Sequence, residues 1–158
     1  MRSQKIGALI VIELGTPLDS IVSNGILIDA EVSAPLLESI FYEGNPLHDG
    51  AVVIRGDVLV GAACRLPLSE SPRLDPTYHM RHRAALGVTE ELHCLAVVVS
   101  EERGSISVAR EGTLIHLESP GDLRDLLIAE LRQPNAVGKK PRRRLFQSGP
   151  KEDHDRTT

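Results

Sequence analysis

The chain has 158 residues, the size of one ordinary domain. Its 41% hydrophobic and 25% charged residues lie close to the averages of soluble globular proteins, which excludes extensive disorder and a collagen-like structure. No apolar run reaches the roughly 18 residues of a membrane-spanning helix, and the first residues lack the apolar region of a signal peptide. We therefore expect a soluble chain that does not enter the secretory pathway.

Charge is distributed unevenly along the chain. Residues 133–158 carry seven Lys or Arg against three Asp or Glu, a net charge of +4, whereas residues 1–132 carry eleven against nineteen, a net charge of −8. An acidic body argues against a general nucleic-acid-binding surface, and the basic run Lys139–Arg144 leaves a tail-borne contact with nucleic acid or anionic lipid as the alternative. The composition of residues 133–158 predicts a disordered tail after a folded domain, residues 1–132.

The first half of the domain is predicted to form a strand, a short extended piece, a helix and a β-hairpin. In chain order these are Ala8–Glu13, Ile26–Ile28, Ala34–Tyr42, and the paired strands Ala51–Ile54 and Val58–Cys64. The first run is almost wholly apolar, which is typical of a strand buried on both faces. Ser33 is a favourable N-cap for the helix, and the Gly-Asn-Pro at residues 44–46 is suited to end it.

A long loop opens the second half of the domain. Residues 67–80 hold three Pro and several polar side chains, and loops of this length in compact domains are often functional. The elements expected after it are a helix, a further helical turn, three short strands and a last helix capped by Ser119: Arg81–Leu86, a turn from Thr89, Leu95–Val99, Ser105–Ala109, Leu114–Leu117 and Asp122–Arg132. Strands interleaved with helices predict a mixed α/β (α+β) fold, with a central mixed β-sheet flanked by helices.

The two cysteines, Cys64 and Cys94, both lie in apolar, strand-like segments. Two residues are too few for a disulfide framework, and their spacing fits no zinc signature. We interpret both as reduced thiols of the core.

Three polar segments interrupt the apolar pattern, and the first is Leu47-His48-Asp49-Gly50-Ala51. Gly50 allows a ligand to approach the backbone closely. Asp49 can bind a divalent cation or accept a proton from a hydroxyl, and His48 can add a nitrogen ligand. The alternative is a turn without a chemical role, since Asp-Gly is common in turns.

The second polar segment, Arg81-His82-Arg83, stands at a predicted helix N-terminus. Free backbone N–H groups there, together with arginine side chains, favour phosphate oxygens. In an acidic body, such a cluster is a candidate clamp for a polyphosphate. The alternative is a solvated basic face that pairs with nearby Glu.

The third polar segment, Ser100-Glu101-Glu102, follows a predicted buried strand. Ligands of open α/β sheets often bind at strand ends, so a glutamate there can coordinate a metal, and a simple charged turn is the alternative. The sequence has no GxxxxGK[ST] phosphate loop and no strand-borne GxGxxG. A nucleotide would therefore be bound by another scheme.

Together these segments resemble the diadenylate cyclase (DAC) domain, which makes cyclic di-AMP from two molecules of ATP. The resemblance covers residues 5–131 and is carried by Asn45–Ala51 and Arg81–Ala85, with support from Cys64–Ser69 and Val99–Glu102. It is closest to the membrane-anchored branch, whose members carry transmembrane helices before this domain. The resemblance implies the DAC fold and a cytoplasmic location as given, or the cytoplasmic face of the cell membrane if the full-length protein has such helices.

The resemblance also implies roles for residues of the first and third segments. Asp49 would help to activate the ribose 3′-hydroxyl and lie near the metal, over a floor shaped by Gly50 and Ala51. The family uses a divalent cation, magnesium or manganese. His48 and Glu102 stand at the matching positions for its additional ligands.

Binding of ATP is implied for a further set of residues. The triphosphate would be held by the second segment and by the start of the third, and the adenine by the loop after the hairpin. These residues are Arg81, His82, Arg83 and Ser100 for the phosphates, Leu66 and Pro67 for the adenine, and Glu101 for ATP as a whole.

Because each 3′-oxygen must attack the α-phosphorus of the other ATP, two active sites have to face each other, and the resemblance implies a homodimer. It further implies a membrane-bound regulator and a phosphoglucosamine mutase as partners. Two departures from the family stand out: His79-Met80 replaces the common Gly-Thr, and Arg65 replaces a frequent Tyr. They motivate the alternative of a non-catalytic nucleotide-binding or interaction module on the same fold.

Overall fold

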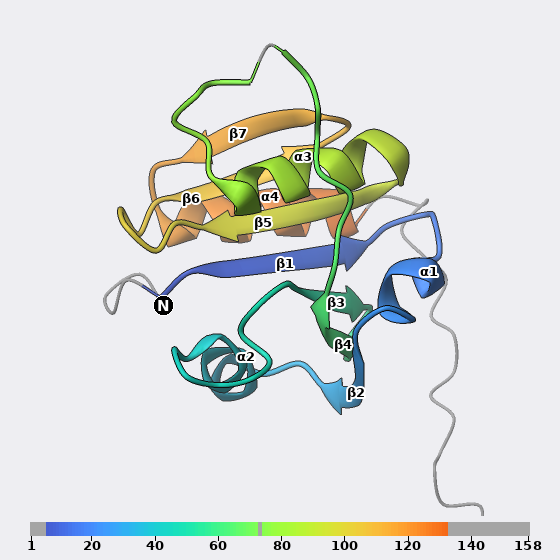
Figure 1. Ribbon diagram of the computed structural model, residues 1–158. Coiled ribbons are helices and arrows are strands. Elements are labelled where there is room, and N and C mark those ends of the chain that lie inside the picture. The colour runs from blue at the N-terminus through green and yellow to red at the C-terminus, as the bar shows by residue number, and fades with distance from the viewer. Residues whose placement is uncertain (1–5, 73, 133–158) are drawn as a thin grey trace, which may run out of the picture.

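The computed structural model describes residues 6–72 and 74–132, which form a seven-stranded sheet in the order β2-β4-β3-β1-β5-β6-β7 (Figure 1). The strands are β1 (Ala8–Glu13), β2 (Ile26–Glu31), β3 (Ala51–Arg55), β4 (Val58–Cys64), β5 (Cys94–Val99), β6 (Ile106–Arg110) and β7 (Thr113–Leu117). Strands β1 and β3 run parallel and the other neighbours run antiparallel. The prediction of a mixed central sheet is confirmed, whereas the predicted tail, residues 133–158, lies outside the described residues.

Helices cover both faces of this sheet. They are α1 (Asp19–Val22), α2 (Ala34–Phe41), α3 (Met80–Glu91) and α4 (Pro120–Leu131). Helices α1 and α3 pack on one face, and α2 and α4 pack on the other (Figure 1). Among the helices of the described ranges, none combines the length and the apolar character needed to cross a membrane.

Alternation along the central strands divides the core between the two faces. In β1, Ala8, Ile10 and Ile12 belong to the core under α2 and α4, whereas Leu9 and Val11 belong to the core under α1 and α3. Successive side chains of a strand point to opposite faces, so a strand covered on both sides needs an apolar residue at every position. This explains the continuous apolar run that predicted β1.

Two helices begin where the capping residues predicted. The Ser33 hydroxyl accepts a hydrogen bond from the Leu36 N–H at 3.2 Å, which caps α2. The Ser119 hydroxyl accepts from the Asp122 N–H at 3.2 Å, and the Asp122 carboxylate accepts from the Ser119 N–H at 3.1 Å. This reciprocal capping box starts α4 at Pro120, two residues before the predicted start.

Helix α3 is longer than the sequence predicted. The expected helix over residues 81–86 and the separate turn from Thr89 are one continuous helix, which runs through Gly87. A Cβ at Gly87 would lie 2.7 Å from the Pro67 carbonyl carbon and 2.8 Å from the Ser69 nitrogen. Gly87 is therefore not a helix end but a position where the loop after β4 lies directly on the helix.

The sequence analysis did not predict α1, a single turn that an ion-pair network supports. The Arg55 guanidinium lies 3.0 Å from the Glu13 carboxylate and 2.7 Å from the Asp19 carboxylate, which raises the pKa of Arg55, with the Asp19 hydrogen bond as the main cause. The Leu18 N–H also donates to Glu13 at 3.4 Å. The two ion pairs of Arg55 join residues distant in sequence, so the sequence around Asp19 alone does not predict the turn.

Cys64 and Cys94 are free and buried, as predicted. Burial raises the pKa of Cys64 to about 11 and that of Cys94 to about 12. Because the reactive species is the thiolate, we expect neither residue of the folded protein to react with Ellman's reagent at pH 8. Both thiols should react after unfolding in guanidinium chloride, and rapid labelling of either one in the folded protein would contradict their placement.

Candidate functional site

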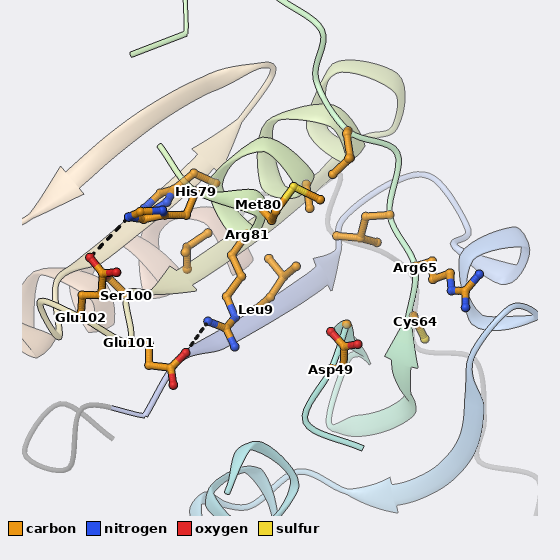
Figure 2. Close-up of a pocket in the computed structure, with 16 residues that line it drawn as sticks. Leu9, Asp49, Cys64, Arg65, His79, Met80, Arg81, Ser100, Glu101 and Glu102 are labelled. Carbon is orange, nitrogen blue, oxygen red and sulfur yellow. Dashed lines mark hydrogen bonds and ion pairs between the residues drawn. The ribbon is translucent and has the colours of Figure 1, made fainter. Parts of the chain in front are cut away.

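A cavity of about 570 Å³ opens between the start of α3, the loop after β5, the loop after β4 and the loop before β3 (Figure 2). Its volume lies within the usual range of small-molecule sites. The residues that line it are Leu9, Asp49, Gly50, Cys64, Arg65, Leu66, Leu68, His79, Met80, Arg81, His82, Ala84, Val98, Ser100, Glu101 and Glu102. The three polar segments of the sequence thus contribute to one cavity.

One wall is formed by Asp49 and Gly50, in the loop between α2 and β3. The Asp49 side chain is exposed and faces the Arg81 side across the cavity in Figure 2. Gly50 has a φ of +98°, a conformation that favours glycine, and a Cβ there would lie 2.8 Å from the Cys64 carbonyl oxygen. The close approach that Gly50 permits is therefore an approach of the β4 backbone, which places Asp49 at the rim.

The opposite wall is the N-terminus of α3. His79 is the N-cap residue, and its side chain makes no capping hydrogen bond within the described residues. His79, Met80, Arg81 and His82 all line the cavity. Uncapped N–H groups and the positive end of the helix dipole favour an anion at this wall.

Arg81 is held only weakly in its present position. Its guanidinium lies 3.4 Å from the Glu101 carboxylate, and the two side chains are 30% and 57% exposed. Exposed ion pairs of this kind contribute at most about 1 kcal/mol to stability. A phosphate group, which accepts charge-assisted hydrogen bonds from the guanidinium, can therefore replace Glu101 as the partner.

His82 differs from its two arginine neighbours because it is buried and uncharged near neutral pH. Burial lowers its pKa, and the nearby His116, His79 and Arg81 lower it further. Its ring stacks on that of Tyr78 at a centroid distance of 5.2 Å. Nδ1 of His82 is the buried side-chain atom without a hydrogen-bond partner among the described residues. His82 therefore lines the cavity as a buried ring stacked on Tyr78 and offers no charge to a ligand.

The third polar segment forms a closed turn at the end of β5. The Ser100 N–H donates to the Ser105 carbonyl at 2.9 Å, and the Gly104 N–H donates to the Ser100 carbonyl at 2.8 Å. Ser100 is buried, whereas Glu101 and Glu102 are exposed. Glu102 lies 3.5 Å from His79, and Glu101 lies 3.4 Å from Arg81 (Figure 2). Two polar contacts therefore join the turn after β5 to the start of α3.

The floor and the remaining wall are more apolar. Leu9 of β1 and Val98 of β5 belong to the core on the α3 side, and Leu66 and Leu68 of the long loop lie beside them in the lining. The sequence analysis named Leu66 but missed Leu9 and Val98. The alternation of β1 and β5 was the signal that places both on the face covered by α3.

Four predicted site residues do not line the cavity: His48, Ala51, Arg83 and Pro67. The His48 ring nitrogen Nδ1 lies 2.6 Å from the Asn45 carbonyl oxygen. Ala51 is fully buried in β3, and the Arg83 side chain is exposed. The Arg83 carbonyl accepts a hydrogen bond from the Ser69 N–H at 2.9 Å and so helps to hold the loop that carries Leu66.

Within the described parts of the chain, no group of three or more His, Cys, Asp or Glu side chains is arranged to hold a metal ion. The expected ligands His48, Asp49 and Glu102 therefore do not form a protein-only cage. Asp49 and Glu102 do line the same cavity. They lie on opposite walls (Figure 2), and a magnesium-type ion is usually bound by one or two carboxylates together with substrate phosphates and water.

The chain is similar to known proteins of one family. The DAC family, described as "DisA bacterial checkpoint controller nucleotide-binding", matches residues 1–114. The chain is 48% identical over 114 residues to the diadenylate cyclase CdaS of Bacillus thuringiensis (strain BMB171), which covers 72% of this chain and 57% of the relative. It is 42% identical over 133 residues to the cyclic di-AMP synthase CdaA of Bacillus subtilis (strain 168), which covers 84% of this chain and 49% of the relative. The chain thus spans about half the length of these curated relatives.

Two solved structures share the fold. A double cysteine mutant of DacA from Staphylococcus aureus superposes with a TM-score of 0.81 and 41% identity, covering 84% of this chain and 89% of that one. A hypothetical membrane spanning protein from Bacillus cereus gives a TM-score of 0.72 and 47% identity, covering 75% of this chain and 58% of that one. These likenesses confirm the fold that the sequence resemblance implied.

Proposed function

Since the chain belongs to the DAC nucleotide-binding family, we propose that it is the catalytic domain of a diadenylate cyclase, which condenses two molecules of ATP into cyclic di-AMP and releases two pyrophosphates. The observation that carries the proposal is the cavity with Asp49 on one wall and with Arg81, His82 and the N-terminus of α3 on the other. The relatives named diadenylate cyclase and cyclic di-AMP synthase support it.

The cavity divides into a part suited to phosphates and a part suited to a base. Arg81, the start of α3 and Ser100 offer charge and hydrogen-bond donors, which suit the triphosphate. Leu66 and Leu68 offer an apolar wall, which suits the adenine. The ribose would then lie between them, with its 3′-hydroxyl toward Asp49.

In the proposed reaction, the 3′-oxygen of each ATP bonds to the α-phosphorus of the other ATP, and the bond from that phosphorus to the α–β bridging oxygen breaks. Each 3′-hydroxyl loses its proton, and each pyrophosphate leaves with the electron pair of the broken bond. Asp49, an exposed carboxylate of the wall, accepts the hydroxyl proton. Positioning and charge neutralisation dominate such transfers, and Arg81 is the residue that supplies positive charge.

Magnesium or manganese, when bound with ATP, would supply further neutralisation of the phosphate charge. Asp49 and Glu102 are the residues that would hold it, because both carboxylates line the cavity. His48 remains a weaker candidate ligand, since its Nδ1 is already in contact with the Asn45 carbonyl.

A facing homodimer is part of the proposal, because each ATP has to attack the other in line. Leu68 and Met80 line the cavity and are 45% and 63% exposed, which favours a covering surface of apolar character such as a second copy of the chain. The membrane-bound regulator, the phosphoglucosamine mutase and a location at the cytoplasmic face of the membrane remain predictions that rest on the family resemblance.

The test is product analysis by chromatography and mass spectrometry after incubation of the protein with ATP and manganese or magnesium. We expect cyclic di-AMP, formed at a rate that rises more steeply than linearly with protein concentration. ATP binding without any cyclic product, in a sample shown to be dimeric, would contradict the proposal. It would favour the alternative, a non-catalytic nucleotide-binding module on the same fold.

A further inference from the structure

The loop after β4, which begins at Arg65, forms one wall of the cavity. At Arg65 this wall is held by a side chain that lies outside the cavity. The Asn24 carboxamide oxygen accepts a hydrogen bond from the Arg65 N–H at 2.8 Å, and the Asn24 carboxamide nitrogen donates to the Arg65 carbonyl at 3.0 Å. Both bonds go to the backbone of one residue, 41 positions away in sequence. Asn24 does not line the cavity, so these bonds bear on the wall and not on a ligand directly.

These two hydrogen bonds extend the sheet beyond its last paired residues. Strands β2 and β4 pair as far as Ile26 and Ala62. After Ala62, the Asn24 side chain takes the place of a strand backbone and bonds to the chain where β4 leaves the sheet. A planar carboxamide, with one donor and one acceptor, reproduces the bonding pattern of a peptide group.

The chain needs such a support because it bends sharply at this point. Ala63 has a φ of +51°, in the left-handed region that favours glycine, and the pairing of β3 with β4 shifts register between Ala51 and Val53. Irregular backbone of this kind changes the direction of a strand and persists when its surroundings hold it. Gly25 allows the close approach, since a Cβ there would lie 2.5 Å from the Cys64 sulfur.

The other end of the wall is anchored on α3. The Ser69 N–H donates to the Arg83 carbonyl at 2.9 Å, and the Ser69 hydroxyl donates to Glu90 at 2.6 Å. The segment 65–68 is therefore suspended between two anchors, Asn24 at one end and Ser69 at the other. Leu66 and Leu68, the apolar lining of the base part of the cavity, lie between them.

From this arrangement we propose that Asn24 is a positioning residue for the nucleobase, which acts through the Arg65 backbone. The inference rests on the proposed function, because it takes the cavity as the ATP site. Loss of the Asn24 carboxamide frees one end of the wall while Asp49 and Arg81 stay in place. Binding of the base then weakens, whereas the chemistry at the phosphates is unchanged.

The test compares the Asn24→Ala variant with the unmodified protein and with Ser23→Ala as the matched control. Ser23 is also exposed, and its hydroxyl donates only to the Ser20 carbonyl at 2.8 Å, away from the wall. We expect Asn24→Ala to raise KM and Kd for ATP about tenfold, the scale of one lost net hydrogen bond, with kcat within about twofold of the unmodified protein. Ser23→Ala should leave all three values unchanged.

A second readout reports on the wall itself. The amide hydrogen of Arg65, which donates to Asn24, should exchange with solvent faster in Asn24→Ala, and its exchange should be unchanged in Ser23→Ala. Asn24→Asp retains the acceptor for that amide but loses the donor, so we expect its Kd for ATP to be intermediate. This variant also covers the case in which Asn24→Ala fails to fold.

The outcomes separate this inference from the proposed function. Tight ATP binding by the unmodified protein and equal binding by Asn24→Ala overturn the positioning role and leave the cyclase proposal intact. A fall in kcat with unchanged KM would also overturn it, because the role would then lie in the chemistry. If the unmodified protein binds no ATP, the proposed function fails, and the inference fails with it.

Discussion

The Asp49→Asn variant is expected to lose at least about a hundredfold in the rate of cyclic di-AMP formation, the scale of a lost general base, while its fold stays intact. Asn keeps the size of the side chain but cannot accept the proton of the 3′-hydroxyl or offer an anionic ligand to a cation. The Asp49 side chain is exposed at the cavity rim, so the free energy of unfolding should change little.

The measurement is the initial rate of product formation, with a thermal melt of the same samples. Asp57→Asn is the matched control, since Asp57 is another exposed aspartate, located in the β3–β4 turn and outside the cavity lining. Retained turnover in Asp49→Asn would show that another group accepts the proton. A lowered melting temperature in that variant alone would point to a structural role for the carboxylate.

The Gly87→Ala variant should be destabilised by about 2–3 kcal/mol, as in overpacked sites, although alanine is the better helix former. The added Cβ would meet backbone atoms of Pro67 and Ser69, which cannot rotate away as the end of a flexible side chain can. Relief requires α3 and the loop to separate. Because this loop carries Leu66 and Leu68, we also expect weaker ATP binding.

Gly121→Ala is the control for this substitution, because Gly121 is also helical and, among the described residues, an added Cβ would lie nearest to the Ser119 hydroxyl oxygen, at 3.5 Å. That distance is an ordinary contact, so its melting temperature should not fall. Chemical denaturation of the three proteins measures the difference in the free energy of unfolding. Equal stability of Gly87→Ala and the unmodified protein would mean that the loop shifts without loss of packing.

Much of the fold followed from local patterns in the sequence. The apolar runs of β1 and β5 predicted strands buried on both faces, and Ser33 and Ser119 predicted helix starts that the structure confirms. Each of these signals depends on the residues within one element. This is why they could be recognised without knowledge of the tertiary structure.

The features that escaped the sequence depend on contacts between distant segments. The turn α1 is supported by Arg55, 36 residues from Asp19, and Gly87 of α3 packs against the loop that precedes the helix. Gly50 was interpreted through a ligand, whereas the β4 backbone is what approaches it. The support of Arg65 by Asn24 joins two residues with no local signature of their relation.

The structure brings members of each of the three polar segments to one cavity. What the sequence did not distinguish is which members face inward. Helical geometry directs Arg81 and His82 to the cavity and leaves the Arg83 side chain exposed, although the three are consecutive. The sequence motif therefore identified the segment, whereas the geometry of the helix determines which of its side chains face the cavity.

The contact between Arg81 and Glu101 has a consequence for turnover. The guanidinium has a carboxylate beside it, at 3.4 Å. An anionic leaving group that departs from Arg81 therefore does not abandon an unpaired cation, because Glu101 stands ready to replace it. Glu101 and a bound anion compete for the same guanidinium, so the carboxylate weakens the hold of Arg81 on the anion. A clamp built in this way would hold an anion less tightly than an arginine without a carboxylate beside it.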